Sequence, residues 1–404
     1  MRRTKGRLYF NLTDAGKVIL KGTGFVALAA LIIPSFGVLS ALISVAIIAL
    51  LMGYVLRPKI QVSGYLPDRI IAGQTTQLKF VIKNIARLPA YNLCLRFNAL
   101  PKTIEQVGNN MIISRLGPGQ TAEVTVSIRP KRRGHYQIRQ PICLSSFPFN
   151  LFNFGISQDR EENLIVLPAF YQLHMPQRHL SRYVGASGMR FTGRTGASLQ
   201  YAGNRPFQPG DSPRKIDARA WARLAMPATK EYHDDFDKYV ALVLDTGVPE
   251  IRRRSKSNEI KELEAAISLC ASVALTIHKE CLVDMLLAGP DLHKFAARPR
   301  MVRLDKIHEI LAGIEPSKSY SLEQSTLTLT EHFYEISEVF FILRSWNKPY
   351  SKLLESACQA GCHCTVLMIG EPRKINTDKY NLNWTGNVQF ISADNILKGQ
   401  IKQL

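Results

Sequence analysis

Two long apolar runs near the N-terminus constrain this chain more than any other feature. The first run, VILKGTGFVALAALII, lies within residues 15–33, and the second, GVLSALISVAIIALLMGYVL, covers residues 37–56. A bilayer core of about 30 Å needs roughly 20 apolar residues in a helix. We therefore expect a basic segment and a transmembrane hairpin over residues 1–57, with spans at about 15–33 and 37–56.

Positive charges flank this hairpin on both sides, and the turn between its two runs carries no charge. Because Lys and Arg are enriched in the cytoplasmic flanks of membrane helices, both ends of the hairpin are expected in the cytoplasm. A cleaved signal peptide would have a single, shorter apolar core. The pattern predicts a multi-pass protein of a bacterial inner (plasma) membrane with a cytoplasmic body. The flanking residues are Arg2, Arg3, Lys5, Arg7, Lys17, Arg57 and Lys59.

The net charge of +20 and the seven cysteines narrow the setting further. Excess positive charge suits nucleic acid or an anionic lipid surface. Membrane lipid is the expected partner, because the anchor already accounts for the charge. The cysteines form an odd set without a CxxC pair, which is typical of a reducing compartment. The run Cys362-His363-Cys364 leads into TVLMIG and is interpreted as a buried strand, not as a metal site.

The body divides into regions of different periodicity. Residues 58–150 alternate apolar and polar positions, as at Leu78, Phe80 and Ile82, which predicts a small antiparallel β-sandwich. Residues 151–237 are expected to connect the domains through a strand, a glycine-rich loop and a charged signature segment. The glycines of residues 183–210 do not have P-loop spacing, so we interpret that loop as structural.

Residues 238–404 alternate short apolar strands with amphipathic helices. A fully apolar strand ends at Asp245, and apolar residues over 260–277 then recur every three or four positions. This alternation predicts a Rossmann-like, doubly wound α/β domain with a parallel sheet. Ligands of such sheets bind beyond the carboxyl ends of the strands, so Asp245 marks the first place to look for chemistry. Further strands are expected at 281–288, 339–343, 365–369 and 388–391, and helices at 301–314, 322–336 and 348–360.

Catalytic motifs such as HExxH and GxSxG are absent from the sequence, and we expect neither an enzyme nor a cofactor. The first alternative is a metal-dependent hydrolase that uses Asp245 and the acidic run at residues 231–237, although a solvated turn is favoured there. The second alternative is nucleic-acid binding through the basic clusters 129–133, 252–254 and 298–300. These clusters are dispersed and lack interleaved aromatic residues, so nucleic acid is not an expected partner. The acidic run contains Glu231, His233, Asp234, Asp235 and Asp237.

The segment GNRPFQPGDSPRKIDARAWAR, residues 203–223, closely resembles the signature of the bacterial "domain of unknown function 58" family. The hairpin, Arg57-Pro58, Arg133-Gly134, the Phe147-Pro148-Phe149 turn and the strand ending at Asp245 follow in the family's order. The resemblance implies a C-terminal domain similar to von Willebrand factor A domains. It also implies a membrane protein that is often encoded beside a MoxR-type AAA+ ATPase, which is therefore the expected protein partner.

The same resemblance implies a metal motif, Asp-x-Ser-x-Ser, after the first strand. Asp245 matches its first position, but Gly247 and Pro249 replace the two serines and supply no side-chain oxygen. Hard cations need such oxygens, and Arg344 in the loop after 339–343 would repel a cation. No metal is therefore expected, and Asp245 is at most a vestigial ligand.

The signature carries alternating charges and allows two interpretations. In the structural one, which we favour, Asp211 caps the next segment and pairs with Arg214, while Asp217 pairs with Arg219 or Arg223. In the functional one, the arginines bind an acidic surface or phosphate on a partner. The hairpin and the absence of catalytic motifs predict a membrane-anchored, non-catalytic scaffold, and the family resemblance implies a role in protein-complex maturation or envelope processes. The candidate partner-binding residues are Arg205, Gly210, Asp211, Arg214, Asp217, Arg219 and Arg223.

Overall fold

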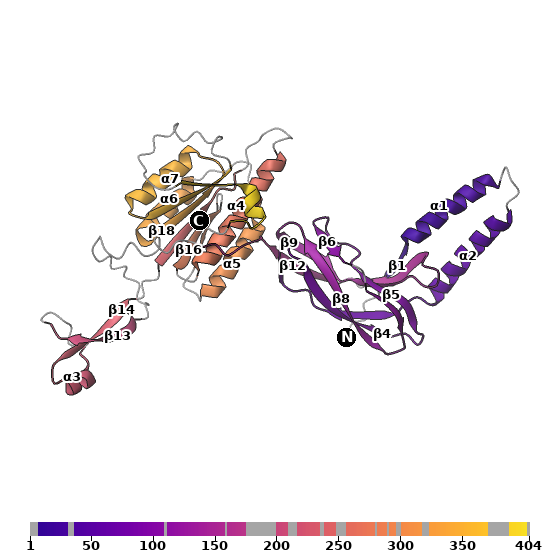
Figure 1. Cartoon of the computed structure of the whole chain (residues 1–404), viewed down its shortest axis with the longest axis horizontal. Coiled ribbons are helices and arrows are strands. Elements are labelled where there is room, and N and C mark those ends of the chain that lie inside the picture. Colours follow the sequence, from indigo (N-terminus) through magenta and orange to yellow (C-terminus); the bar gives the residue numbers. More distant parts are fainter. Residues whose placement is uncertain are drawn as a thin grey trace. The chain divides into compact units, whose positions relative to one another are not determined.

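The structure is a computed structural model of the whole chain, and its fold is mixed α/β (Figure 1). The chain divides into two compact units: unit 1 (Met1–Ala169 with His308–Ile314) and unit 2 (Phe170–Ile307 with Glu315–Leu404). The residues described are 7–30, 36–108, 111–157, 160–174, 199–208, 216–234, 238–247, 256–278, 281–288, 291–295, 300–316, 323–370 and 388–401.

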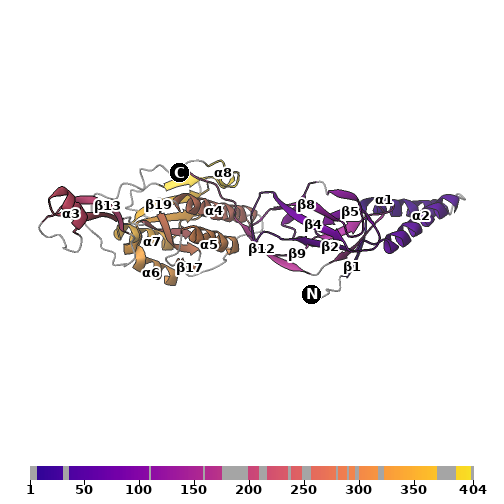
Figure 2. The same cartoon turned by 90° about the horizontal axis from the view of Figure 1, so that it is seen from below.

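Helices α1 (Asp14–Ala29) and α2 (Phe36–Val55) of unit 1 lie side by side in both views (Figures 1 and 2). α2 has 20 residues with a mean hydropathy of 2.5, and most of its side chains are exposed. Among the described residues it is the one helix that is long and apolar enough to cross a bilayer. α1 has 16 residues and includes Lys17 and Lys21, so the first expected span, at about 15–33, stays a prediction.

The rest of unit 1 is a β-sandwich-like body of mostly antiparallel sheets. The strand orders are β1-β11-β10-β5-β7, β2-β4-β8-β6 and β3-β12-β9. The expected alternation is confirmed in β4, where Leu78, Phe80 and Ile82 are buried and the residues between them are exposed. Residues from all three sheets share one hydrophobic core. Burial of that common apolar face holds the sheets together.

Three strands extend unit 1 beyond the expected limits of residues 58–150. β1 precedes the hairpin, whereas β11 and β12 lie in the segment that was expected to connect the domains. Each added strand pairs with a strand edge that would otherwise be open. The strands of unit 1 are β1 (Arg7–Leu12), β2 (Ile60–Gly64), β3 (Arg69–Ile71), β4 (Thr76–Asn84), β5 (Ala90–Arg96), β6 (Ile104–Val107), β7 (Ile112–Leu116), β8 (Thr121–Pro130), β9 (Gly134–Arg139), β10 (Ile142–Ser145), β11 (Phe152–Ser157) and β12 (Glu161–Leu167).

Unit 2 contains a six-stranded sheet in the order β17-β16-β15-β18-β19-β20. β15 (Lys238–Leu244), β16 (Cys281–Ala288), β18 (Glu338–Leu343), β19 (His363–Ile369) and β20 (Val388–Ile391) are parallel, and they confirm the five strands expected from the sequence. The edge strand β17 (Asp291–Lys294) is antiparallel and was not expected. Its four residues, DLHK, have no apolar alternation that would indicate a strand.

Helices cover both faces of this sheet (Figure 1). α6 (Glu323–His332) and α7 (Lys348–Gln359) share one core with alternate residues of β15, β18 and β19. α4 (Lys256–Ile277) packs on the same strands without joining that core, so it covers the opposite face. Tight packing on both faces explains why the central strands are largely apolar. The remaining helices are α5 (Arg300–Gly313), whose residues from His308 onward belong to unit 1, a 3-10 helix (Phe333–Glu335) and α8 (Ala393–Leu397).

A separate two-stranded sheet carries the signature segment. β13 (Leu199–Pro206) and β14 (Ala228–Asp234) pair antiparallel, and the short helix α3 (Ala218–Leu224) lies between them in the chain (Figure 1). Residues 199–206 were expected to belong to a glycine-rich loop. Pairing with β14 orders them as a strand, and the register shifts between Tyr201 and Gly203, which leaves Ala202 as an extra residue on β13.

Candidate functional site

Asp245 lies where the strand order of the unit 2 sheet reverses. β15 ends at Leu244 and β18 ends at Leu343, and these neighbouring parallel strands lead away to β16 on one side and β19 on the other. Such a switch point, beyond the carboxyl ends of the strands, is where open α/β sheets bind ligands. The residue is buried, with 1% of its surface exposed. The loop after Leu244, where the sequence analysis expected any chemistry, thus lies at this switch point.

The carboxylate of Asp245 accepts hydrogen bonds from protein groups on both of its oxygens. Oδ1 accepts from the backbone N–H of Gly247 at 3.0 Å and from the hydroxyl of Tyr350 at 3.2 Å. Oδ2 accepts from the backbone N–H of Arg344 at 3.3 Å, and from the N–H and hydroxyl of Ser345 at 3.2 and 3.1 Å. A carboxylate offers about four lone-pair sites, so these donors saturate it. Asp245 thereby ties β15, β18 and the first turn of α7 together.

This arrangement does not fit a bound divalent cation. These five hydrogen-bond partners of the carboxylate are all donors, whereas a hard cation requires several oxygens that are free to coordinate it. The described residues contain no group of three His, Cys, Asp or Glu side chains that could hold a metal. In that same part of the chain, Nε and Nη1 of Arg344 and Nε1 of Trp346 are buried without a hydrogen-bond partner. The guanidinium adds positive charge at this edge, which opposes cation binding.

Asp217, one of the signature residues that the structure describes, has a structural role. Its Oδ1 accepts from the backbone N–H groups of Arg219, at 3.0 Å, and Ala220, at 3.2 Å, so it caps the N-terminus of α3. Its Oδ2 accepts from the side-chain amide of Asn204 on β13 at 3.2 Å. The bond from Ala220, followed by those from Asn204 and Arg219, lowers the pKa of Asp217 despite some desolvation. Asp217 thus joins α3 to β13.

The expected ion pair between Asp217 and Arg219 or Arg223 is not formed in the described part of the chain. Asp217 binds backbone groups instead, because a cap must face the first N–H groups of its helix. Both arginine side chains are exposed. Arg205, on β13, donates to the carbonyl of its neighbour Pro206 at 3.2 Å. Three further candidates, Gly210, Asp211 and Arg214, lie outside the described residues.

Large apolar side chains accompany these arginines. Trp221 is 46% exposed, Leu224 is 49% exposed and Met226 is 49% exposed. Trp221 and Leu224 are three positions apart on α3, so they share one face of the helix. The combination of exposed Trp and Arg is typical of residues that dominate protein interfaces. The apolar part of this surface was not predicted, because the expectation for this segment rested on its charges alone.

The acidic run and the Cys-His-Cys run lie partly on strands. Glu231, His233 and Asp234 lie on β14, so part of the run expected as a solvated turn is strand; Asp235 and Asp237 lie outside the described residues. In β19 the expectation of a buried strand holds: Cys364 is buried, which raises the pKa of its thiol.

The basic cluster at residues 129–133 is used within unit 1. Buried Arg133 donates to the carbonyl oxygens of Leu311, at 3.0 Å, and Ile314, at 2.7 Å, at the end of α5. Arg129 donates to the carbonyl of Gly73 at 3.1 Å. These contacts weigh against the nucleic-acid alternative, because a buried arginine cannot reach phosphate. The clusters at 252–254 and 298–299 lie outside the described residues.

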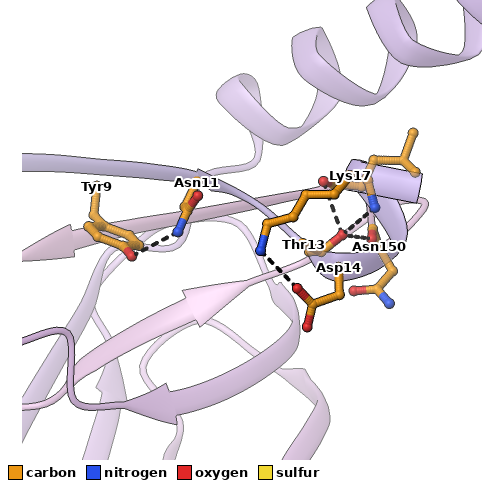
Figure 3. Close-up of polar contacts among 8 residues, drawn as sticks. Tyr9, Asn11, Thr13, Asp14, Lys17 and Asn150 are labelled. Carbon is orange, nitrogen blue, oxygen red and sulfur yellow. Dashed lines mark hydrogen bonds and ion pairs between the residues drawn. The ribbon is translucent and has the colours of Figure 1, made fainter. Parts of the chain in front are cut away.

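A polar site that the sequence analysis missed lies at the base of α1 (Figure 3). Thr13 accepts the N–H of Gly16 at 2.9 Å, which caps α1, and its hydroxyl contacts the carbonyl oxygens of Asn150 and Leu151. Its own N–H donates to Leu151 at 3.0 Å. These bonds fasten α1 to the turn before β11. The Thr13-Asp14 pair before an apolar run was the available signal.

No protein-family model matches the chain, and no curated protein matches it. Among solved structures, Salmonella alpha-2-macroglobulin is 17% identical over 30% of this chain, with a TM-score of 0.21. This match is to a point mutant of that protein and spans 9% of its chain. The CARDB domain of a Pyrococcus furiosus protein, solved with di-metal ions, is 15% identical over 28% of this chain and 90% of that chain, with a TM-score of 0.19. Native alpha-2-macroglobulin from Escherichia coli gives 16% identity over 40% of this chain and 22% of that chain, with a TM-score of 0.22. Overlaps this low assign no function.

Proposed function

We propose that this chain is a membrane-anchored, non-catalytic interaction protein of a bacterial inner membrane that partners a MoxR-type AAA+ ATPase in protein-complex maturation. The observation that carries the proposal is α2, an apolar helix of 20 residues with most of its side chains exposed. Exposed apolar surface is unfavourable in water by about 25 cal/mol per Å². A bilayer removes that surface from water, and the length of α2 fits its apolar core.

The architecture of unit 2 supports the finer part of the proposal. Parallel strands in the order β16-β15-β18-β19-β20, with an antiparallel edge strand, agree with a Rossmann-like domain of von Willebrand factor A type. That is the domain implied by the resemblance to the domain of unknown function 58 family. The saturated carboxylate of Asp245 favours binding of a protein partner without a bridging cation.

The docking surface of this proposal is the exposed face around α3. Trp221 supplies a large apolar anchor, and Arg219 and Arg223 supply charges that complement an acidic surface. Burial of an aromatic anchor with flanking guanidinium groups is the pattern that carries most binding energy in protein complexes. The functional interpretation of the signature thus applies to its arginines, while Asp217 has the structural role of holding α3 in place.

The test is co-purification of the full chain, in lipid nanodiscs, with a MoxR-type ATPase from the same organism. We expect a complex that survives purification in at least one nucleotide state. The double variant Arg219→Glu/Arg223→Glu should lose the complex, because it reverses the charge of the docking surface. A matched control is Arg87→Glu, at an exposed arginine of unit 1, which should retain the complex.

Two outcomes would contradict the proposal. If the wild-type chain forms no complex with ATP, with ADP or without nucleotide, the MoxR-type ATPase is not its partner. Equal loss in the Arg87→Glu control would show that charge in general, and not the α3 surface, controls the interaction. Circular dichroism of each variant verifies that the chain is folded before binding is compared.

A further inference from the structure

The strand pair β1–β11 has one face that is apolar along its whole length. Residues directly opposite each other on the two strands share a face, as do residues two apart on one strand. One face therefore combines three apolar pairs, whereas the other face contains the pairs Tyr9 with Gly155 and Asn11 with Asn153. The apolar pairs are Leu8 with Ile156, Phe10 with Phe154, and Leu12 with Phe152.

Three phenylalanine rings form the middle of this face. The ring centroid of Phe10 lies 5.5 Å from that of Phe152 and 5.3 Å from that of Phe154. Phe154 is buried, but Phe10 is 46% exposed and Leu8 is 51% exposed. The sandwich core therefore does not cover the outer part of this face. We define Leu8, Phe10, Phe152 and Ile156 as the ribbon patch.

The ribbon patch is continuous with the base of α2. A Cβ atom added to Gly53 would lie only 2.1 Å from the ring of Phe154, so this turn of α2 rests directly on the ring. Close approach here requires glycine. α1 starts two residues after β1 ends and is fastened beside β11 through Thr13. Both helices thus leave the β-body at the strand pair that carries the patch.

The length of α2 determines how deep in the bilayer the contact between Gly53 and Phe154 lies. Its 20 residues rise about 1.5 Å each, which matches the roughly 30 Å apolar core of a bilayer and leaves no spare turn at the end. Gly53, near the C-terminus of α2, then lies at the boundary between acyl chains and headgroups. Phe154 touches Gly53, and Phe10 lies directly opposite Phe154, so the patch lies at the same boundary.

The side chains around this level suit that environment. The guanidinium of Arg57 lies 5.2 Å from the ring centroid of Tyr54, at the end of α2. Aromatic rings collect at the membrane interface, and nearby arginines bind anionic headgroups. We propose that the ribbon patch is a lipid-contacting surface, inserted at the headgroup boundary of an anionic bilayer. This inference rests on the proposed membrane anchor, and it makes part of the β-body a membrane-binding element.

Tryptophan probes in the full chain test this proposal. Phe10→Trp reports on the patch, Asn11→Trp reports on the opposite face one residue away, and Val45→Trp reports on the middle of α2. Each variant is reconstituted in phosphatidylcholine–phosphatidylglycerol vesicles with and without brominated acyl chains, and the spectrum of the parent chain is subtracted. We expect the added fluorescence of Phe10→Trp and Val45→Trp to be largely quenched by brominated lipid. Asn11→Trp should be quenched by aqueous acrylamide instead.

The possible outcomes test the lipid-contacting patch and the membrane anchor separately. Quenching of Val45→Trp without quenching of Phe10→Trp would overturn the lipid-contacting patch and leave the anchor standing. Equal lipid quenching of Phe10→Trp and Asn11→Trp would also overturn it. Protection of Phe10→Trp from both quenchers would assign the patch to a protein surface, such as a second copy of the chain. An unquenched Val45→Trp would overturn the anchor and the patch together.

Discussion

Replacing Asp245 with asparagine tests whether the switch point is held together by a saturated carboxylate. The substitution conserves shape but gives the side chain one oxygen and one NH2 group. If the oxygen takes the position of Oδ2, the NH2 group faces the N–H of Gly247, which now bonds at 3.0 Å. Two donors then oppose each other inside a buried site.

The expected loss follows from the hydrogen bonds involved. A hydrogen bond to a charged group contributes about 1.5–3 kcal/mol, and a buried unsatisfied donor costs about 1–3 kcal/mol more. Asp245→Asn should therefore lower the free energy of unfolding of unit 2 by about 3–5 kcal/mol. For a unit of this size, that corresponds to a melting temperature lower by about 10 °C.

Thermal unfolding of the full chain by circular dichroism, with hydrogen exchange of β15 and β18, measures the effect. Asp394→Asn is the control, because Asp394 makes an exposed ion pair with Lys261 at 2.6 Å and should change little. An unchanged melting temperature for Asp245→Asn would refute the reasoning. Stabilisation of the wild-type protein by Mg²⁺ would refute it too. A cation bound at this site, at 100 times its Kd, would raise the free energy of unfolding of the wild type by about 2.7 kcal/mol.

Three further predictions concern packing and titration. Gly16→Ala should increase hydrogen exchange in β1, because the new methyl group would lie 2.1 Å from the carbonyl oxygen of Leu151. The hydrogen bond that His363 donates to the carboxylate of Glu338 raises the pKa of His363, so this pair stabilises the fold most below about pH 6.5. Stability relative to His363→Gln should therefore decrease as pH rises through the folded-state pKa, as measured by denaturant unfolding at several pH values. Burial raises the pKa of Cys270 to about 12, so iodoacetamide should label it at pH 8 only after unfolding, as read by mass spectrometry.

Strongly periodic segments were predictable from the sequence. The apolar residues that indicated a helix over 260–277 are the buried face of α4, and the apolar run before Asp245 is β15. Such patterns predict the structure well because the apolar residues that recur with the helix or strand period are the residues that become buried. The site position at Asp245 followed from the same alternation, since ligands of parallel sheets bind beyond the carboxyl ends of the strands.

Features that depend on pairing with distant residues were not predictable. β1 has the sequence RLYFNL, whose alternation is short and lies beside a much stronger helical signal. Its identity as a strand comes from β11, far along the chain. The donors around Asp245 were missed for a similar reason: backbone N–H groups and the Tyr350 hydroxyl carry no motif. Asp217 was expected to pair with an arginine because the sequence does not show where α3 begins.

The pairing of β1 with β11 has a consequence for how the protein reaches its membrane topology. During synthesis β1 emerges before the hairpin and cannot pair with β11 until nearly all of unit 1 has left the ribosome. In the proposed anchor, an N-terminus that crossed the bilayer during that interval could never reach β11. The sheet would then keep an open edge, and α1 would lose the contacts of Thr13. In the proposed topology, therefore, the sheet can be completed only in a chain whose β1 has stayed on the same side of the bilayer as β11.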